Sequence, residues 1–244
     1  MKEPSETIAI SNSAFNPISS PAVEYTLYYL HDPMCSWCWG FRPTWNALRE
    51  LLTKVYPQIT IQYVLGGLAP DSDEPMPLAM QEMLATTWRR IPQVVPSAIF
   101  NHDFWRICHP RRSTYLSCRG VIAATQQSAA SEEPMILAIQ QAYYLHAQNP
   151  SDTETLINCA GSIGLNVDRF ERDLNSPDTE QLLQNNIEHY RQLALQSGVS
   201  GFPGLVLGLA VLDNQEAKHR YYGIDIDYCH PNSILAAIAE RLSL

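Results

Sequence analysis

The chain has 244 residues, of which 45% are apolar and 17% are charged. This length fits one ordinary domain, or one domain with a large insertion, and the apolar share excludes a disordered chain. Lysine and arginine number 16 against 25 aspartate and glutamate residues, so the formal net charge is −9. An acidic chain of this kind is a poor binder of nucleic acid and of anionic membrane surfaces.

Residues 1–22 lack both the basic start and the apolar core of a secretory signal. We therefore expect these residues to form a loose leader that is disordered in part, and the protein to be cytoplasmic. The longest apolar run, residues 201–212, is interrupted by Pro203 and is shorter than the ~20 residues that a bilayer requires. We expect no membrane span.

The first elements in chain order predict a βαβ unit. Residues 24–30 are rich in β-branched and aromatic side chains and predict a strand, which residues 31–33 (His-Asp-Pro) break. Apolar residues at helical spacing then continue up to Pro57, and residues 59–65 predict a second strand. Strand, helix and strand within so short a segment are typical of a βαβ unit.

The middle of the chain, from about residue 76 to residue 197, has a mostly helical pattern. Its last helix is predicted to start at Ser176-Pro177 and to stop at Gly198. The β character then returns. We predict a strand at 205–212, a turn at 213–216, a short partner strand at 219–222 and a closing amphipathic helix at 231–242.

Cys35 and Cys38 form a C-x-x-C where the first strand gives way to the first helix. Residues three apart are neighbours on a helical turn, so the two sulfurs can bond. The free N–H groups and the positive dipole end of a helix stabilise a thiolate at the first position. Cys38, one turn further in, is expected to be more buried. This asymmetry suits an attacking thiolate and a second thiol that resolves a mixed disulfide.

The run Gly198-Val199-Ser200-Gly201-Phe202-Pro203 directly precedes the returning strand. With the C-x-x-C and with Pro43 five residues after Cys38, it resembles the thioredoxin superfamily, and most closely its DsbA-like (FrnE-like) branch. In that family the G-V-x-G-x-P proline is cis and faces the disulfide. The resemblance therefore implies that the Phe202–Pro203 bond is cis.

The resemblance implies an α/β, thioredoxin-like fold with the order β-α-β … β-β-α, a central mixed sheet and a large all-helical insertion. The expected thioredoxin-like domain comprises residues 23–67 and 199–244, and the expected helical insertion comprises 68–198. The implied function is that of a thiol–disulfide oxidoreductase, a protein-disulfide oxidoreductase or isomerase that exchanges disulfides with protein, peptide or small-thiol substrates. The disulfide itself carries the electrons, so no dissociable cofactor is expected.

By this resemblance Cys35 is the nucleophile, Cys38 is the resolving thiol, and Pro203 shapes the substrate groove and keeps metals from the thiols. The dipeptide between the cysteines is neither the Gly-Pro nor the Pro-His of familiar relatives. Because that dipeptide helps to set the redox potential, oxidation, reduction and isomerisation all stay open.

Other residues beside the motif are candidates for binding and tuning. Trp37 is expected to be partly exposed and to offer an apolar surface to a substrate, and Ser36 and Phe202 are further candidates for substrate contact. His31 and Asp32 are candidates for tuning the reactive thiol. The alternative for both is turn chemistry that closes the strand.

Two alternatives belong to other functional classes. One is a glutathione-dependent transferase or isomerase of kappa-like type, since residues 222–225 (Tyr-Gly-Ile-Asp) resemble a glutathione-binding segment of that class. Glutathione is also a candidate co-substrate of an oxidoreductase, and an arginine cluster could attract such an anion: Arg89, Arg90, Arg106, Arg111, Arg112 and Arg119. The other is a thioredoxin-fold chaperone or binding protein that uses Trp37 as a contact.

The four remaining cysteines, Cys108, Cys118, Cys159 and Cys229, are most simply buried small hydrophobes. A second redox pair between Cys108 and Cys118 is a weaker alternative. A zinc site is not expected, because no second C-x-x-C and no paired-histidine motif accompanies the first.

Overall fold

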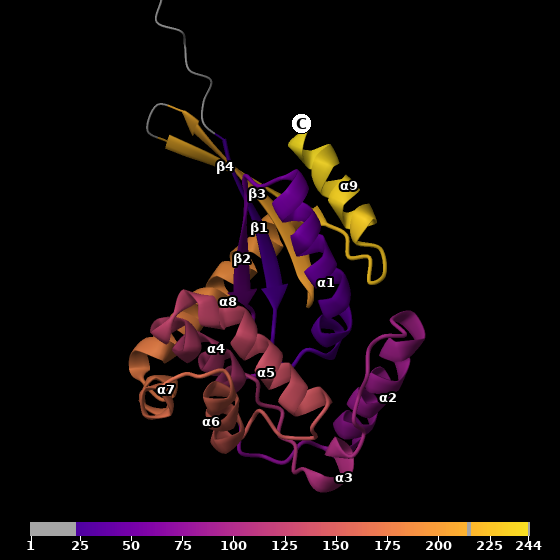
Figure 1. The fold of residues 1–244 in the computed structure, drawn as a ribbon, viewed down its shortest axis with the longest axis vertical. Coiled ribbons are helices and arrows are strands. Elements are labelled where there is room, and N and C mark those ends of the chain that lie inside the picture. Colours follow the sequence, from indigo (N-terminus) through magenta and orange to yellow (C-terminus); the bar gives the residue numbers. More distant parts are fainter. Residues whose placement is uncertain (1–22, 214–215, 244) are drawn as a thin grey trace, which may run out of the picture.

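The computed structural model describes residues 23–213 and 216–243 (Figure 1). Its elements, in chain order, are β1 (Val23–His31), α1 (Ser36–Val55), β2 (Ile59–Leu65), α2 (Leu78–Val94), α3 (Phe104–Ile107), α4 (Tyr115–Gln127), the 3₁₀ turn η1 (Ala129–Ser131), α5 (Glu132–Tyr144), α6 (Thr153–Ser162), α7 (Val167–Leu174), α8 (Pro177–Ser197), β3 (Gly204–Asp213), β4 (Glu216–Ile224) and α9 (Pro231–Leu242).

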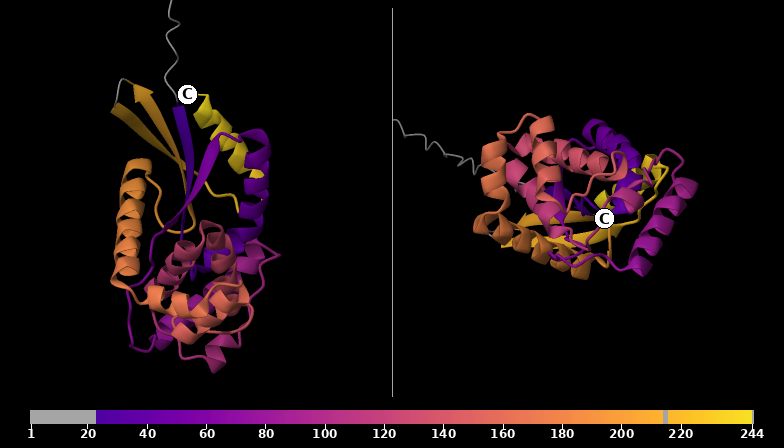
Figure 2. Two further views of the ribbon diagram at one scale, coloured as in Figure 1. Left: turned by 60° about the vertical axis from the view of Figure 1, so that its left-hand side comes forward. Right: turned by 90° about the horizontal axis from the view of Figure 1, so that it is seen from below.

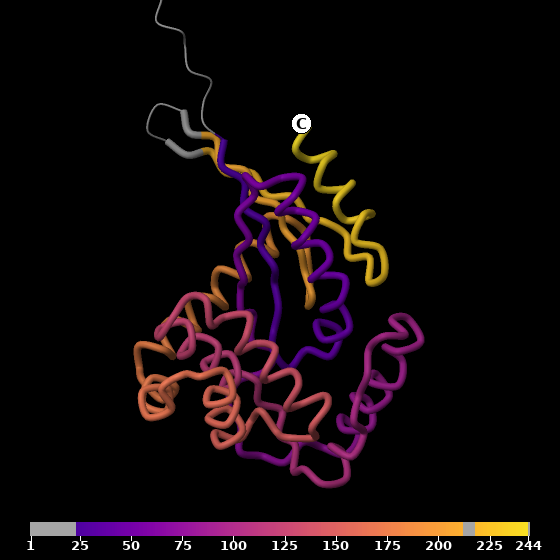
Figure 3. Tube along the Cα trace, in the orientation of Figure 1, coloured from indigo at the N-terminus to yellow at the C-terminus, as the bar shows by residue number. Residues whose placement is uncertain are grey.

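The four described strands form a mixed sheet with the order β2-β1-β3-β4. β1 pairs parallel with β2 from Tyr25 opposite Ile59 to His31 opposite Leu65, while β1–β3 and β3–β4 are antiparallel. The chain leaves the sheet after β2 and returns at β3. Most of the trace between them forms the lower part of the molecule (Figure 3), and α8 runs back along the sheet. This is the expected thioredoxin-like α/β fold with a helical insertion.

Helices cover both faces of the sheet (Figure 2). α1 and α9 lie on one face, where a core that includes Leu27, Trp45 and Ile238 is buried. α8 covers the other face and buries Leu193 against Val206. The sheet is therefore buried on both sides, which explains why β3 is apolar almost throughout rather than alternating.

The insertion contains two further cores. The helices α4 to α8 enclose an aliphatic cluster around Met135, Leu156 and Phe170. α2 and α3 hold an aromatic cluster around Trp88, in which the Trp88 ring lies 5.2 Å from the Tyr144 ring. Partly buried side chains from the start of α1 pack against this second cluster. The division of the chain at 67/68 and 198/199 stays a prediction, because α8 packs on the sheet as well as on α4.

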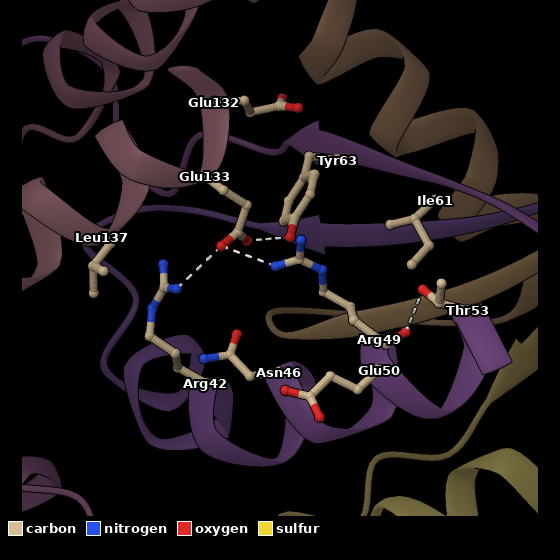
Figure 4. Close-up of a pocket in the computed structure, with 10 residues that line it drawn as sticks. All are labelled: Arg42, Asn46, Arg49, Glu50, Thr53, Ile61, Tyr63, Glu132, Glu133 and Leu137. Carbon is tan, nitrogen blue, oxygen red and sulfur yellow. Dashed lines mark hydrogen bonds and ion pairs between the residues drawn. The ribbon is translucent and has the colours of Figure 1, made fainter. Parts of the chain in front are cut away.

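A charged seam joins α1 and β2 to α5 around a cavity of about 570 Å³ (Figure 4). Glu133 lies 3.3 Å from Arg42 and 3.0 Å from Arg49, and it accepts a hydrogen bond from Tyr63. Arg42 also donates to Gln140 at 2.6 Å. A partly buried carboxylate is tolerated here because two guanidinium groups and a hydroxyl satisfy it.

Several predicted boundaries move by a few residues. The predicted bounds of the closing helix and of the second strand are confirmed. The predicted start and stop of α8 are confirmed too: Ser176 caps the helix by accepting a hydrogen bond from the Thr179 amide, and Gly198 ends it with φ 74°. The last strand is longer than predicted, because it pairs with β3 along its whole length. The expected leader 1–22 and part of the expected turn at 213–216 lie outside the described residues.

None of the described helices is both long enough and apolar enough to cross a membrane.

Glu132, beside Glu133 in the cavity, makes stability depend on pH. Burial, together with the neighbouring Glu133 charge, raises its pKa from 4.5 to about 7. The folded state therefore holds this proton more tightly than the unfolded state, and the free energy of unfolding falls as pH rises from 4.5 to about 7. We expect Glu132→Gln to remove part of this decline, measured by urea denaturation at several pH values. Glu50→Gln at the same cavity is the control, and an unchanged slope in Glu132→Gln would contradict the assignment.

Candidate functional site

Cys35 occupies the N-cap of α1, directly after the turn that follows β1. Its backbone is extended, with φ −78° and ψ 114°, and the amide of Cys38 donates to its Sγ at 3.4 Å. No acidic residue lies in the first turn of α1. A sulfur at this position faces the free N–H groups and the positive end of a 20-residue helix, and both favour a thiolate.

The two thiols differ in burial. Cys35 is 7% exposed and Cys38 is fully buried, as expected, and both are free thiols. Burial raises the pKa of Cys38 well above its ordinary value, and the neighbouring Cys35 sulfur adds to this shift. Cys38 is therefore held as a neutral thiol while Cys35 stands at the surface end of the pair.

The loop before β3 lies against the Cys35 sulfur. The Phe202–Pro203 peptide bond is cis, as predicted, and the Cys35 thiol donates to the Phe202 carbonyl at 3.5 Å. The Phe202 ring itself points elsewhere: it packs against the Tyr190 ring of α8, tilted by 38° with the ring centres 4.7 Å apart, and it covers Gly66. The backbone of Phe202, rather than its side chain, is what this residue presents to the thiol.

Asp32 is a buried hub between the motif and the insertion. Its carboxylate accepts from the Met34 amide at 2.8 Å, the Leu68 amide at 2.8 Å and the Thr114 hydroxyl at 2.7 Å. The Cys118 thiol approaches it at 3.6 Å. Burial raises the pKa of Asp32, and the hydrogen bonds from Leu68 and Thr114 oppose this shift. The expected turn chemistry is present in the Met34 contact, and the other partners extend it across the molecule.

His31 has a different position from the one expected. It does not break the first strand but is its last residue, because it still pairs with Leu65. Its ring is buried between Tyr29, at 5.2 Å, and Tyr63, at 5.5 Å. Burial, with a smaller contribution from the Arg42 charge, lowers the pKa of His31 to about 3. It is therefore neutral at physiological pH.

Aromatic side chains border the motif on the side of the insertion. Trp37 is half-buried, as expected, with its ring 5.0 Å from Tyr228 and the Arg90 guanidinium 6.0 Å from its centre. Trp39 stacks at 5.5 Å on Tyr144. Ser36 is the first residue of α1 and is half-buried. These contacts bring α2 and α5 of the insertion to the edge of the thiol pair.

Other candidate residues are dispersed. In the arginine cluster Arg106, Arg111 and Arg119 form ion pairs with acidic neighbours, so the cluster is not one free cationic face. The expectation of four buried cysteines is correct for Cys118 and Cys159 and wrong for Cys229, which is exposed. Cys108 is partly exposed. Within the described residues there is no cluster of three or more His, Cys, Asp and Glu side chains that could hold a metal ion.

Three contributors to the site were not found from the sequence. Thr114 and Cys118 reach Asp32 from 82 and 86 residues away. Gly66 leaves the space that the Phe202 ring fills, since an added Cβ would lie 1.9 Å from the tip of that ring. A signal existed only for Gly66, as one of two glycines after a strand, and that pattern is as common in ordinary turns.

Replacing Asp32 should destabilise the whole site. In Asp32→Ala one buried and two partly buried donors lose their acceptor, at ~1–3 kcal/mol each, so we expect the free energy of unfolding to fall by about 3 kcal/mol or more. Thr114→Val removes one of these donors and also the acceptor of the buried Ala69 amide, and it should cost less, about 2 kcal/mol. Urea denaturation of the two variants tests this, and an equal loss in both would contradict the hub.

Gly66 should tolerate no side chain while Phe202 is present. We expect Gly66→Ala to destabilise the fold by ~1–3 kcal/mol because the Phe202 ring must move. In Gly66→Ala/Phe202→Val the clash is absent, so the cost should be smaller than the sum of the single changes. Gly120→Ala is the control, since its nearest neighbour would lie at 3.5 Å. Additive costs in the double variant would contradict the contact.

Known proteins match the chain at the level of family and fold. A family model described as thioredoxin matches residues 28–234. Among solved structures, a proposed protein disulfide isomerase from Nitrosomonas europaea has a TM-score of 0.72 at 23% identity and covers 90% of this chain and 98% of its own. The cytosolic disulfide reductase DsbM from Pseudomonas aeruginosa has a TM-score of 0.65 at 20% identity, with coverage of 89% and 98%. DsbM has also been solved with GSH, and that structure has a TM-score of 0.63.

The curated relatives are named as adapter proteins rather than as oxidoreductases. The ClpXP adapter protein SpxH of Halalkalibacterium halodurans is 24% identical over 68% of this chain, and that of Bacillus subtilis is 20% identical over 76%. The chain spans 54% and 58% of the lengths of these two relatives. The match to the family model covers most of the sheet and the whole insertion. The chain belongs to the thioredoxin family, and its helical insertion gives it the DsbA-like form of that fold.

Proposed function

We propose that this protein is a thiol–disulfide oxidoreductase with Cys35 and Cys38 as its redox centre. The observation that carries the proposal is the position of the Cys35 sulfur, which caps a long helix and lies 3.5 Å from the Phe202 carbonyl. Cys38 is fully buried behind it. An attacking thiolate needs stabilisation and access, whereas a resolving thiol needs only to reach the first sulfur.

The reduced protein has both groups that the exchange requires. The Cys35 thiolate attacks one sulfur of a substrate disulfide, forms a mixed disulfide and releases the other substrate sulfur as a thiolate. Cys38 then loses its proton and attacks the Cys35 sulfur, which releases the second substrate thiolate and leaves a Cys35–Cys38 disulfide. The substrate gains two electrons and the protein loses two. The reverse sequence oxidises a substrate dithiol.

The proposed substrates are protein or peptide disulfides and thiols, with glutathione as a candidate partner that returns the Cys35–Cys38 pair to its reduced state. The solved structure of DsbM with GSH supports this choice, and the cytosolic description of DsbM supports a cytoplasmic location.

We propose that Pro203 shapes the groove beside Cys35 and that Trp37 contacts the substrate. The Cys35–Cys38 potential sets the direction: ~ −270 mV, as in thioredoxin, favours reduction, and ~ −120 mV, as in DsbA, favours oxidation.

Substituting each cysteine separates their roles. We expect Cys35→Ser to abolish the reduction of a peptide disulfide. Cys38→Ser should still attack but should accumulate a mixed disulfide with the substrate, because the resolving thiol is missing. Non-reducing mass spectrometry detects that adduct. Cys229→Ser, which changes the exposed thiol, should keep wild-type turnover. Full activity of Cys35→Ser, or an adduct on Cys229, would contradict the proposed redox centre.

A second candidate function is that of a protease adapter, in which the thioredoxin fold binds a protein without redox chemistry. The name of the curated relatives favours it, as do large apolar side chains in and near α2, of which Leu78 is 76% exposed and Ile99 is 66% exposed. An adapter does not need its thiols. Stimulated degradation of a purified substrate by ClpXP that is equal for the wild type and for Cys35→Ser/Cys38→Ser would favour this function.

The kappa-like transferase is the weaker alternative. Tyr222 of the expected glutathione segment packs under Arg241, at 5.5 Å from the guanidinium, and Gly223 pairs with Val206 inside the sheet. Gly223, Ile224 and Asp225 line a cavity that also contains Pro203, whereas Tyr222 does not. Conjugation of glutathione to an electrophile by Cys35→Ser/Cys38→Ser would favour the transferase, since that chemistry does not use the disulfide.

A further inference from the structure

A cationic side chain from the insertion lies beside the dipeptide that separates the two cysteines. The Arg90 guanidinium lies 6.0 Å from the centre of the Trp37 ring, and Trp37 is two residues after Cys35. The Tyr228 ring also borders Trp37, at 5.0 Å between the ring centres. Arg90 is exposed. Its charge is therefore available to a molecule that approaches over Trp37.

The position of Arg90 is fixed by the residue that follows it. Ile91 is fully buried, and its Cγ2 lies 2.8 Å from where a Cβ on Gly40 would be. α2 therefore approaches the first turns of α1 so closely that only glycine fits there. Trp88, one turn of α2 earlier, is buried in the aromatic cluster against which Trp37 packs. These two contacts hold the end of α2 against the motif.

Arg90 has no acidic partner among the described residues. Its neighbour Arg89 donates only to Thr86, at 3.1 Å. Seven of the twelve other arginines, all of them among the described residues, form ion pairs: Arg42, Arg49, Arg106, Arg111, Arg119, Arg169 and Arg191. A net negative charge repels anions in general, so the unpaired cation over Trp37 acts locally.

We propose that Arg90 selects substrates that carry a carboxylate close to the reactive sulfur, with Trp37 as the surface on which the substrate lies. This inference rests on the proposed oxidoreductase function and names the substrate class of the same site. The carboxylate can belong to an acidic residue next to a cysteine in a peptide, or to a small thiol such as glutathione. In both cases the guanidinium meets the carboxylate with two parallel donors, a geometry that lysine cannot reproduce.

The exposure of Arg90 sets the expected size of the substrate preference. An exposed ion pair contributes about 0.2–1 kcal/mol, so we expect a peptide disulfide with glutamate beside its cysteine to have a kcat/KM about 1.4- to 5-fold higher than its glutamine analogue. High salt weakens exposed pairs, so about 1 M sodium chloride should bring this ratio towards one. The preference should appear mainly in KM, because the pair forms on binding.

The experiment compares the two peptides with wild type, Arg90→Gln, Arg90→Glu and Arg172→Gln. Arg172 is exposed on α7, in another part of the insertion (Figure 1), and its variant is the matched control. We expect the glutamate-to-glutamine ratio to fall to about one in Arg90→Gln, to fall below one in Arg90→Glu, and to stay at the wild-type value in Arg172→Gln. A second arm compares kcat/KM for oxidised glutathione with that for its tetraethyl ester, which lacks the free carboxylates. This comparison tells whether a small disulfide shares the preference for a carboxylate.

The outcomes separate the role of Arg90 from the oxidoreductase function. Wild-type turnover with equal kcat/KM for the two peptides would overturn the role of Arg90 and leave the oxidoreductase function standing. A wild-type preference that persists in Arg90→Gln, or a preference lost in Arg172→Gln as well, would overturn it too. Absence of turnover with every substrate would instead overturn the proposed function, and Cys35→Ser provides that baseline.

Discussion

A buried carboxylate holds together the segments that meet at the reactive thiols. Asp32 follows β1, and its oxygens bind the loop that leads to Cys35, the segment after β2 and the start of α4. A buried charge is tolerated only when its hydrogen-bonding capacity is filled. The contacts therefore constrain each other: the loop, the crossover and the insertion must all be in place for the carboxylate to be satisfied.

This constraint explains how a helical insertion can contribute to chemistry on a separate sheet. The insertion contacts α1 at two polar or aromatic seams. One is the Glu133 pair with Arg42 and Arg49, and the other is the aromatic cluster that receives Trp37. These two contacts hold the first turns of α1 in place. Precise placement matters because a disulfide exchange needs three sulfurs in line, and small displacements of a reacting group are costly.

The thiol pair combines two environments within one helical turn. Cys35 lies at the end of α1 and touches the Phe202 carbonyl, whereas Cys38 is enclosed by protein. Helix geometry provides this contrast, since successive turns move a side chain 5.4 Å further from the helix end. Of the residues flanking the motif, Asp32 joins three segments by hydrogen bonds and its charge contributes to the raised pKa of Cys38, whereas neutral His31 adds no charge near the thiols.

The sequence by itself determined the features that depend on local pattern: the C-x-x-C at the start of α1, the cis Phe202–Pro203 bond implied by the family motif, the Ser176 cap and the mixed α/β fold. Only the tertiary structure decided that His31 ends β1 in the core, that the Phe202 ring fills the space above Gly66, that Thr114 satisfies Asp32 and that Arg90 reaches Trp37. These contacts join segments as far apart in the chain as Gly66 and Phe202. Periodicity and turn chemistry specify which face of an element is apolar, but the partner of a single polar side chain is set by how the elements are packed together.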